Sequence, residues 1–267
     1  MGNISSIKNQ HIRNWKNSNP ASILDLSNLG IKSLPPIPNN VKILDCHGNL
    51  LTELPKNLPN SITKLYCDHN DLKYLPDNLP SNLEYLYCQN NNLKCLPNNL
   101  SSNIIFLNCN DNQISLLPET LPNNLKELYC NDNKISELPN YLPNNLTILY
   151  CKNNKLKCLP NNLPSNISII YCNDNFITYL PLSLPSNLKI LWCQRNKLSL
   201  LPNILPDDLK ELYCNNNNLT ELPNTLPDSL TILYCANNKI EYLPNKLPPN
   251  LIKLYCDGNK FTDIKKK

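Results

Sequence analysis

Residues 146–164 read Leu-Thr-Ile-Leu-Tyr-Cys-Lys-Asn-Asn-Lys-Leu-Lys-Cys-Leu-Pro-Asn-Asn-Leu-Pro, and this pattern recurs along almost the whole chain. Its first cysteine belongs to a series spaced by 21 residues, here called the ladder cysteines: Cys46, Cys67, Cys88, Cys109, Cys130, Cys151, Cys172, Cys193, Cys214, Cys235 and Cys256. A fixed period of this length is typical of a stacked-repeat protein. A residue that recurs in every repeat is therefore expected to build the fold rather than to carry chemistry.

Positions in the repeat are counted here from the ladder cysteine as zero. Aliphatic residues stand at −5, −2, +5 and +8, asparagine stands at +3 in all eleven copies, and two Leu-Pro pairs follow. A degenerate copy begins at Leu24, which gives about twelve repeats. We therefore divide the chain into an N-terminal segment, residues 1–22, and a solenoid, residues 23–267. Proline in every return segment argues against a regular helix there and fits an extended backbone.

This pattern is the leucine-rich repeat, with cysteine in the third apolar place. Its short unit and double Leu-Pro punctuation resemble those of the bacterial effectors of the YopM and IpaH type. The resemblance implies a leucine-rich-repeat solenoid, curved into an arc. It also implies a parallel β-sheet on the concave side, polyproline-like segments on the convex side and an N-terminal helical cap.

The composition places bounds on function. With 267 residues, 41% of them hydrophobic, the chain can bury one long core, and its formal net charge of +4 gives no argument for nucleic acid. The sequence has no apolar run of membrane-spanning length and no signal peptide. We therefore expect a cytoplasmic protein with reduced thiols, located in the host cytoplasm if it is effector-like.

The cysteine and asparagine series each have a structural interpretation. The ladder cysteines could in principle form disulfides, a metal array or a redox sensor, but a buried apolar filler is favoured. No C-x-x-C pair occurs and the histidines lack zinc-ligand spacing, so neither a metal site nor a cofactor is predicted. The asparagines are expected to satisfy backbone groups at the bend that follows each strand.

Position −1 is the feature that the fold does not prescribe. Nine of its eleven residues are aromatic, and the last seven form an unbroken run. Side chains alternate along a strand, so positions −3 and −1 should face the concave side. The predicted partner-binding residues are Tyr129, Tyr150, Tyr171, Trp192, Tyr213, Tyr234, Ile148, Ile169 and Ile190. Tyrosine and tryptophan dominate binding hot spots. The alternative is that neighbouring rings only pack on one another and stabilise the sheet.

The expected partner is a polypeptide. Charges on the concave positions are mixed in sign, for example Lys152 against Glu127 and Glu211, whereas a phosphate-binding surface needs a basic stripe. Aromatic rings alone could stack on unpaired bases. Because arginines are not clustered here, no nucleic-acid partner is predicted.

The N-terminal segment carries two further predictions. Ile4, Ile7, Ile12 and Trp15 fall on one face at helical spacing, which predicts a short cap over the first repeat. Met1-Gly2 with Ser6 fits the myristoylation pattern, so Gly2 is a predicted lipidation site and membrane contact through it is expected to be weak.

Two classes of function follow. One is a non-enzymatic scaffold that binds a protein on its concave aromatic face. The other is a ubiquitin-ligase relative, because IpaH-type proteins join such an array to a catalytic domain. The chain ends at residues 261–267 within a repeat, and no catalytic constellation is evident, so we expect no enzyme. A duplicated array without a specific partner stays open, as does the oligomeric state.

Overall fold

A computed structural model describes residues 23–261. The predicted N-terminal helical cap and Gly2 lie outside the described residues. The chain divides into two compact units, residues 1–134 and 135–267, and each is a run of the same repeat. The first unit contains β1 (Ile23–Asp25), β2 (Ile43–Asp45), β3 (Lys64–Tyr66), β4 (Tyr85–Tyr87), β5 (Phe106–Asn108) and β6 (Glu127–Tyr129). The second contains β7 (Ile148–Tyr150), β8 (Ile169–Tyr171), β9 (Ile190–Trp192), β10 (Glu211–Tyr213), β11 (Ile232–Tyr234) and β12 (Lys253–Tyr255).

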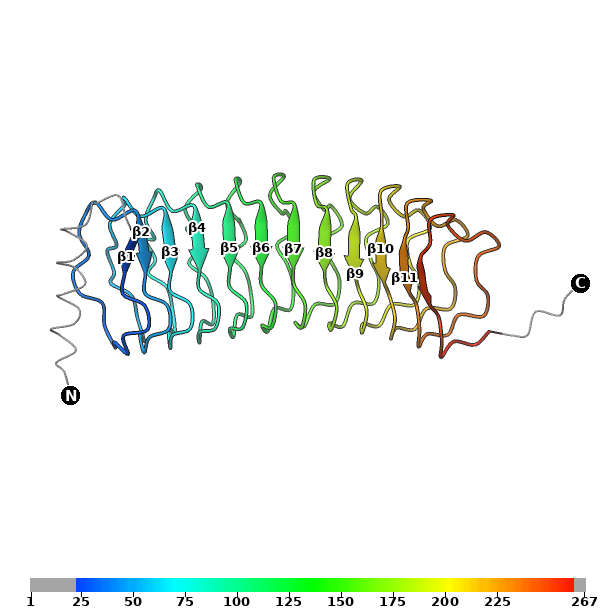
Figure 1. Cartoon of the computed structure of the whole chain (residues 1–267), viewed down its shortest axis with the longest axis horizontal. Helices are drawn as coiled ribbons and strands as arrows, with labels where there is room; N and C mark the ends of the chain where they lie inside the picture. Colours follow the sequence, from blue (N-terminus) through cyan, green and yellow to red (C-terminus); the bar gives the residue numbers. More distant parts are fainter. Residues whose placement is uncertain (1–22, 262–267) are drawn as a thin grey trace, which may run out of the picture. The chain divides into compact units, whose positions relative to one another are not determined.

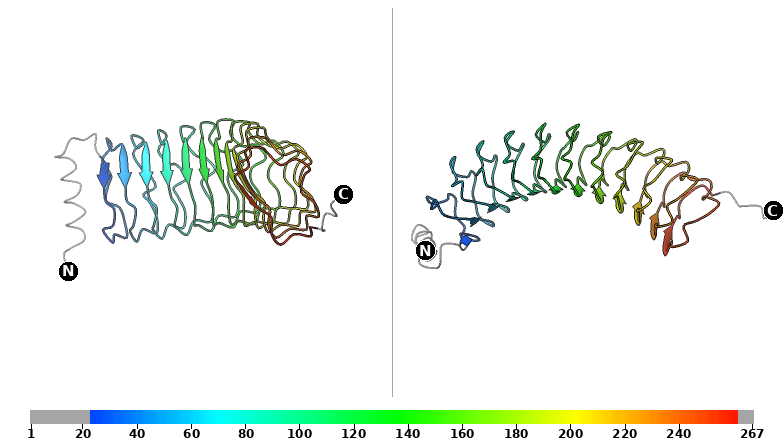
Figure 2. Two further views of the ribbon diagram at one scale, coloured as in Figure 1. Left: turned by 45° about the vertical axis from the view of Figure 1, so that its right-hand side comes forward. Right: turned by 90° about the horizontal axis from the view of Figure 1, so that it is seen from above.

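Within each unit the strands pair in parallel with the next strand in chain order (Figure 1). Equivalent repeat positions face each other, as with Ile170 and Leu191. Each strand is three residues long, and its middle residue at −2 points into the core. Between strands the described chain contains turns and bends but no helix. In each unit the strands line the inner side of the curve and the return segments fan out on the other side (Figure 2).

The core of each unit consists of stacked columns of identical position. The ladder cysteines from Cys46 to Cys235 are buried, and so are the leucines and isoleucines at −5, −2, +5 and +8 through most repeats. Cys46 and Cys109 direct their thiols at the carbonyl oxygens of Tyr66 and Tyr129, at 3.2 and 3.4 Å. The prediction that these cysteines are core residues is confirmed. A small side chain suits this place because each one contacts its equivalents in the turns above and below.

The asparagine at +3 closes the bend that follows each strand. Asn175 is buried, and its Oδ1 accepts a hydrogen bond from the Leu156 N–H at 3.0 Å. Its Nδ2 donates to three carbonyl oxygens, those of Cys151, Cys172 and Asn173, at 3.0 to 3.1 Å. The same set of bonds recurs from Asn49 to Asn238. The prediction that the asparagines satisfy backbone groups is confirmed.

The second Leu-Pro pair begins a tight turn. The carbonyl oxygen of Pro143 accepts a hydrogen bond from the Leu146 N–H at 2.9 Å, and the same bond joins Pro185 to Leu188. In the first of these turns asparagines occupy the second and third places, and asparagine is a common turn residue. The turn returns the chain to the sheet at position −5, which explains the short period.

Position +2 requires a left-handed backbone, a feature that the sequence interpretation missed. Its φ angle lies between 50° and 70° in each of the repeats that carry a ladder cysteine. The residues there are Gly48, His69, Asn90, Asp111, Asp132, Asn153, Asp174, Arg195, Asn216, Asn237 and Gly258. Glycine, asparagine and aspartate adopt this conformation most readily. Arg195, with φ 54°, is the bulky exception.

We predict that Arg195→Asn raises the free energy of unfolding by about 0.5–1 kcal/mol, because asparagine relieves the backbone strain. Arg195 Nη1 lies 3.7 Å from Asp174 Oδ1, but an exposed ion pair of this kind contributes little to the free energy of unfolding. Urea denaturation of both proteins measures the difference. The reciprocal change Asn216→Arg, in the next turn, should lower stability by a similar amount. A less stable Arg195→Asn protein would show that the ion pair outweighs the strain.

Candidate functional site

The second unit carries a continuous stack of aromatic rings on its sheet. Tyr150 stacks on Tyr171, with ring centroids 4.2 Å apart and planes at 11°, and Tyr171 stacks on Trp192 at 4.1 Å and 8°. Trp192 and Tyr213 are tilted at 49°, and the stack then continues through Tyr234 to Tyr255. In-register pairing of parallel strands positions the rings in this way, since it sets equal positions side by side. Eight of the nine predicted binding residues therefore lie in this one unit.

Stacking determines which parts of these rings are accessible to solvent or to a partner. The side chains from Tyr150 to Tyr234 are half-buried rather than fully exposed, while Tyr255 at the end of the column is 45% exposed. Except at the tilted pair Trp192–Tyr213, neighbouring rings cover one another's faces, so that mainly ring edges and hydroxyl groups form the surface. Ile148, Ile169 and Ile190 pair in register beside them and are also half-buried. The predicted apolar and aromatic patch thus exists as a packed strip that runs along the second unit.

The hydroxyl groups of the strip are partly paired. Burial, followed by a hydrogen bond with Tyr150, raises the pKa of Tyr171. Burial likewise raises the pKa of Tyr213, with a smaller contribution from the Glu211 carboxylate. Burial also raises the pKa of Tyr234, with a smaller contribution from the neighbouring Tyr255 hydroxyl. The strip is therefore uncharged at neutral pH, and its hydroxyls remain hydrogen-bond donors and acceptors.

Tyr129, the ninth predicted residue, lies in the first unit. It packs against Phe106 at 5.2 Å, and its hydroxyl donates to Glu127 Oε2 at 2.8 Å. Position −1 of this turn is Asn108, which has no aromatic ring. Phe106, at position −3 of the same turn, contacts Tyr87 instead and continues the row of rings. Tyr66 and Tyr85 complete this second aromatic cluster. The sequence interpretation missed it because it followed aromatic residues at position −1 alone and considered only isoleucines at −3, although Tyr85 and Phe106 at −3 were visible in the pattern.

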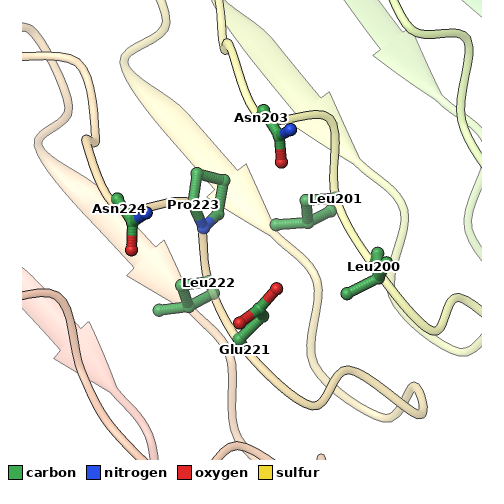
Figure 3. A pocket seen from close by; sticks show the side chains of 7 residues that line it. All are labelled: Leu200, Leu201, Asn203, Glu221, Leu222, Pro223 and Asn224. Carbon is green, nitrogen blue, oxygen red and sulfur yellow. The ribbon is translucent and has the colours of Figure 1, made fainter.

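Several pockets of the described residues lie on the return segments. One, between segments 200–203 and 221–224, holds about 40 Å³, whereas small-molecule sites measure about 300–1,000 Å³ (Figure 3). A wider hollow of about 570 Å³ is lined by Leu182, Ile204, Asp207 and six neighbouring residues with Asp208 among them, and none of its lining residues is a histidine or a cysteine. Within residues 23–261 no group of three or more His, Cys, Asp or Glu could hold a metal ion. No helix in that range has the length and apolar character of a membrane span.

Comparison with known proteins identifies the family. The leucine-rich-repeat family model matches residues 82–103 and 208–228. A structure of YopM, a leucine-rich effector protein from Yersinia pestis, is 31% identical, with a TM-score of 0.59, and the match covers 96% of this chain and 88% of that one. The chain belongs to the leucine-rich-repeat family.

Two other leucine-rich-repeat structures are similar. A protein of Leptospira interrogans is 28% identical with a TM-score of 0.72, and the match covers 91% of this chain and 74% of that one. The leucine-rich-repeat domain of a Shigella effector is 28% identical with a TM-score of 0.56, and the match covers 74% of this chain and 79% of that one. A search of curated protein sequences gave no significant match. The predicted resemblance to short-repeat bacterial effectors is confirmed.

Proposed function

We propose that this leucine-rich-repeat protein is a non-enzymatic scaffold that binds a polypeptide partner on the sheet face of its second unit. The aromatic strip carries the proposal. Repeat solenoids use the concave face as an extended binding surface, and tyrosine and tryptophan supply large contact areas at low entropic cost. The isoleucines at −3 widen the strip on one side.

Ring orientation favours a polypeptide over a nucleic acid. Single-stranded bases bind by stacking on open ring faces. In the strip those faces are already in contact with neighbouring rings at 4.1–4.5 Å, except at the tilted pair Trp192–Tyr213. Edges and hydroxyl groups remain available, and they suit apolar side chains and backbone amides. Neighbouring charges of both signs, Glu211 and Lys253 at −3, also disfavour a phosphate backbone.

Ring packing is the competing explanation for the strip, and the close stacking supports it as well. The two are compatible, because a stack that stabilises the sheet also holds its edges rigid for a partner. The effector-like role and a location in a host cytoplasm rest on the Yersinia and Shigella relatives, which are described as effectors. We also propose that Gly2 is lipidated, which would attach the protein weakly to a membrane.

The test uses lysine at position −3, where the fold already accepts it, since β3 and β12 begin with Lys64 and Lys253. We expect a protein captured from eukaryotic cell lysate by the wild type to be lost when Ile169→Lys and Ile190→Lys are combined. The matched control is Ile43→Lys, at the same position in the first unit. The captured protein is then purified, and its affinity is measured for all three forms.

If the double variant loses affinity about tenfold or more and the Ile43→Lys control does not, the result supports the second unit as the binding surface. Equal binding by all three forms would contradict the proposal and leave ring packing as the role of the strip.

A further inference from the structure

Three polar atoms without hydrogen-bond partners belong to residues at or just beyond the carboxyl ends of the neighbouring strands β8 and β9. They are Asn173 Oδ1, Trp192 Nε1 and Gln194 Oε1, each buried and without a hydrogen-bond partner. The only other such atom in the described chain is Gln89 Oε1, in the first unit. Buried polar groups in proteins are nearly always paired, so a cluster of three needs a reason.

Their places in the repeat bring these atoms together. Trp192 occupies position −1 of β9, and Asn173 and Gln194 occupy position +1 of two neighbouring turns. The Asp174 N–H donates to the Gln194 carbonyl oxygen at 3.1 Å, and the Cys172 N–H donates to that of Trp192 at 2.8 Å, so the two turns are in register here. Trp192 belongs to the aromatic strip, and Asn173 and Gln194 lie beside it.

The orientation of Asn173 is fixed. Its Nδ2 donates to Asp174 Oδ2 at 2.6 Å, and a carboxylate can only accept, so Oδ1 is the atom left over. The residue is only 4% exposed, which means that packing holds the side chain in place and that the unpaired oxygen does not belong to a mobile group. Trp192 Nε1–H can only donate.

The cluster therefore offers one donor and two acceptors. A carboxylate would pair with the indole N–H but would face two carbonyl oxygens. A cation would suit the oxygens but would be repelled by the N–H. In an extended peptide the N–H and C=O of one residue point to the same side, so the segment presents donors and acceptors together along one edge.

We infer that Asn173, Trp192 and Gln194 form a backbone-reading site for an extended peptide segment. In it, a peptide carbonyl accepts from Trp192 Nε1–H, and peptide N–H groups donate to Gln194 Oε1 and Asn173 Oδ1. This inference rests on the proposed function and specifies how part of the partner is held. Access requires the Gln194 side chain to turn outward, and its oxygen loses no hydrogen bond in doing so.

The same turn departs from the repeat pattern at two other places. Position −1 carries tryptophan where the other repeats of this unit carry tyrosine, and position +2 carries Arg195 in a strained left-handed conformation. Trp192 is also where the ring stack tilts, by 49° against Tyr213. These departures fall within four residues of one another, at a site where regular packing alone would favour the common residues.

The experiment begins with a phage-displayed library of linear dodecapeptides, selected on the purified full chain. Selected peptides are titrated against Trp192→Phe, which keeps an aromatic ring in the stack but removes the indole N–H, and against Gln194→Leu. We expect each variant to bind about tenfold more weakly, while the control Gln89→Leu binds as the wild type does. Methylating one peptide amide nitrogen should weaken binding by a similar factor, at one position of the peptide only.

Two readouts separate the outcomes. Thermal unfolding of Gln194→Leu should occur at no lower temperature than in the wild type, since this change removes an unpaired buried oxygen. Peptides that bind both variants as well as the wild type, yet are lost in the Ile169→Lys and Ile190→Lys protein, would overturn this inference and leave the proposed function standing. Failure to select any binding peptide would also overturn it.

Discussion

Raising the pH from 8 to 10 is expected to lower the free energy of unfolding by on the order of 10 kcal/mol. The cause is the column of buried thiols. Burial raises the pKa of Cys109 and Cys172 to about 12, from an ordinary value of 9.0. It also raises the pKa of six other deeply buried ladder cysteines: Cys46, Cys67, Cys88, Cys130, Cys193 and Cys214.

The direction follows from proton binding. Between pH 8 and pH 10 the unfolded chain loses its thiol protons, whereas the folded chain keeps them. Because the unfolded state binds fewer protons there, stability is present below the unfolded pKa and is lost as pH rises above it. From pH 8 to pH 10 each buried thiol contributes about 1.4 kcal/mol in total, because the full slope is reached only above the unfolded pKa of 9.0. Single domains have about 5–15 kcal/mol of stability in all. The protein should therefore unfold by about pH 10.

Urea denaturation at half-unit intervals from pH 7 to pH 10, under a reducing agent, measures the effect. The matched variant combines Cys172→Ala with Cys193→Ala. It should lose about 1 kcal/mol per site at pH 7 through lost packing, but its stability should fall less steeply above pH 9. Identical pH dependence in the two proteins would show that the buried thiols do not govern the alkaline transition.

Asn175→Ala is expected to lower the free energy of unfolding by about 3 kcal/mol. The side chain makes four hydrogen bonds to the backbone, and alanine can replace none of them. The Leu156 N–H would be left buried without its acceptor, which costs more than a lost exposed bond. A repeat protein is stabilised between neighbouring turns, so the loss is felt on both sides of the bend.

Chemical denaturation of the variant measures this loss. Asn162→Ala serves as the control, since Asn162 is an exposed asparagine on the return segment of a neighbouring turn, and its replacement should change stability by no more than about 0.5 kcal/mol. Equal effects at the two positions would mean that the hydrogen bonds of the asparagine at position +3 do not stabilise the fold.

Much of the fold could be predicted because each place in the repeat has one physical task. The cysteine, the asparagine at +3 and the leucines all occupy the places that the pattern predicts. The left-handed position +2 could also have been read from its glycine, asparagine and aspartate residues, but Arg195 and His69 obscured that signal. The aromatic residues at −1 identified the strip, yet their number did not reveal that the rings cover one another's faces.

The sequence by itself determined the repeat, the parallel order of the strands and the columns of the core. It could do so because in a solenoid each turn contacts only its neighbours, and the period therefore sets the register. The tertiary structure alone decided how much of each ring stays accessible, and it alone left Asn173, Trp192 and Gln194 without partners. Those outcomes depend on the directions in which side chains of adjacent turns point, and residue order along a single turn does not specify them.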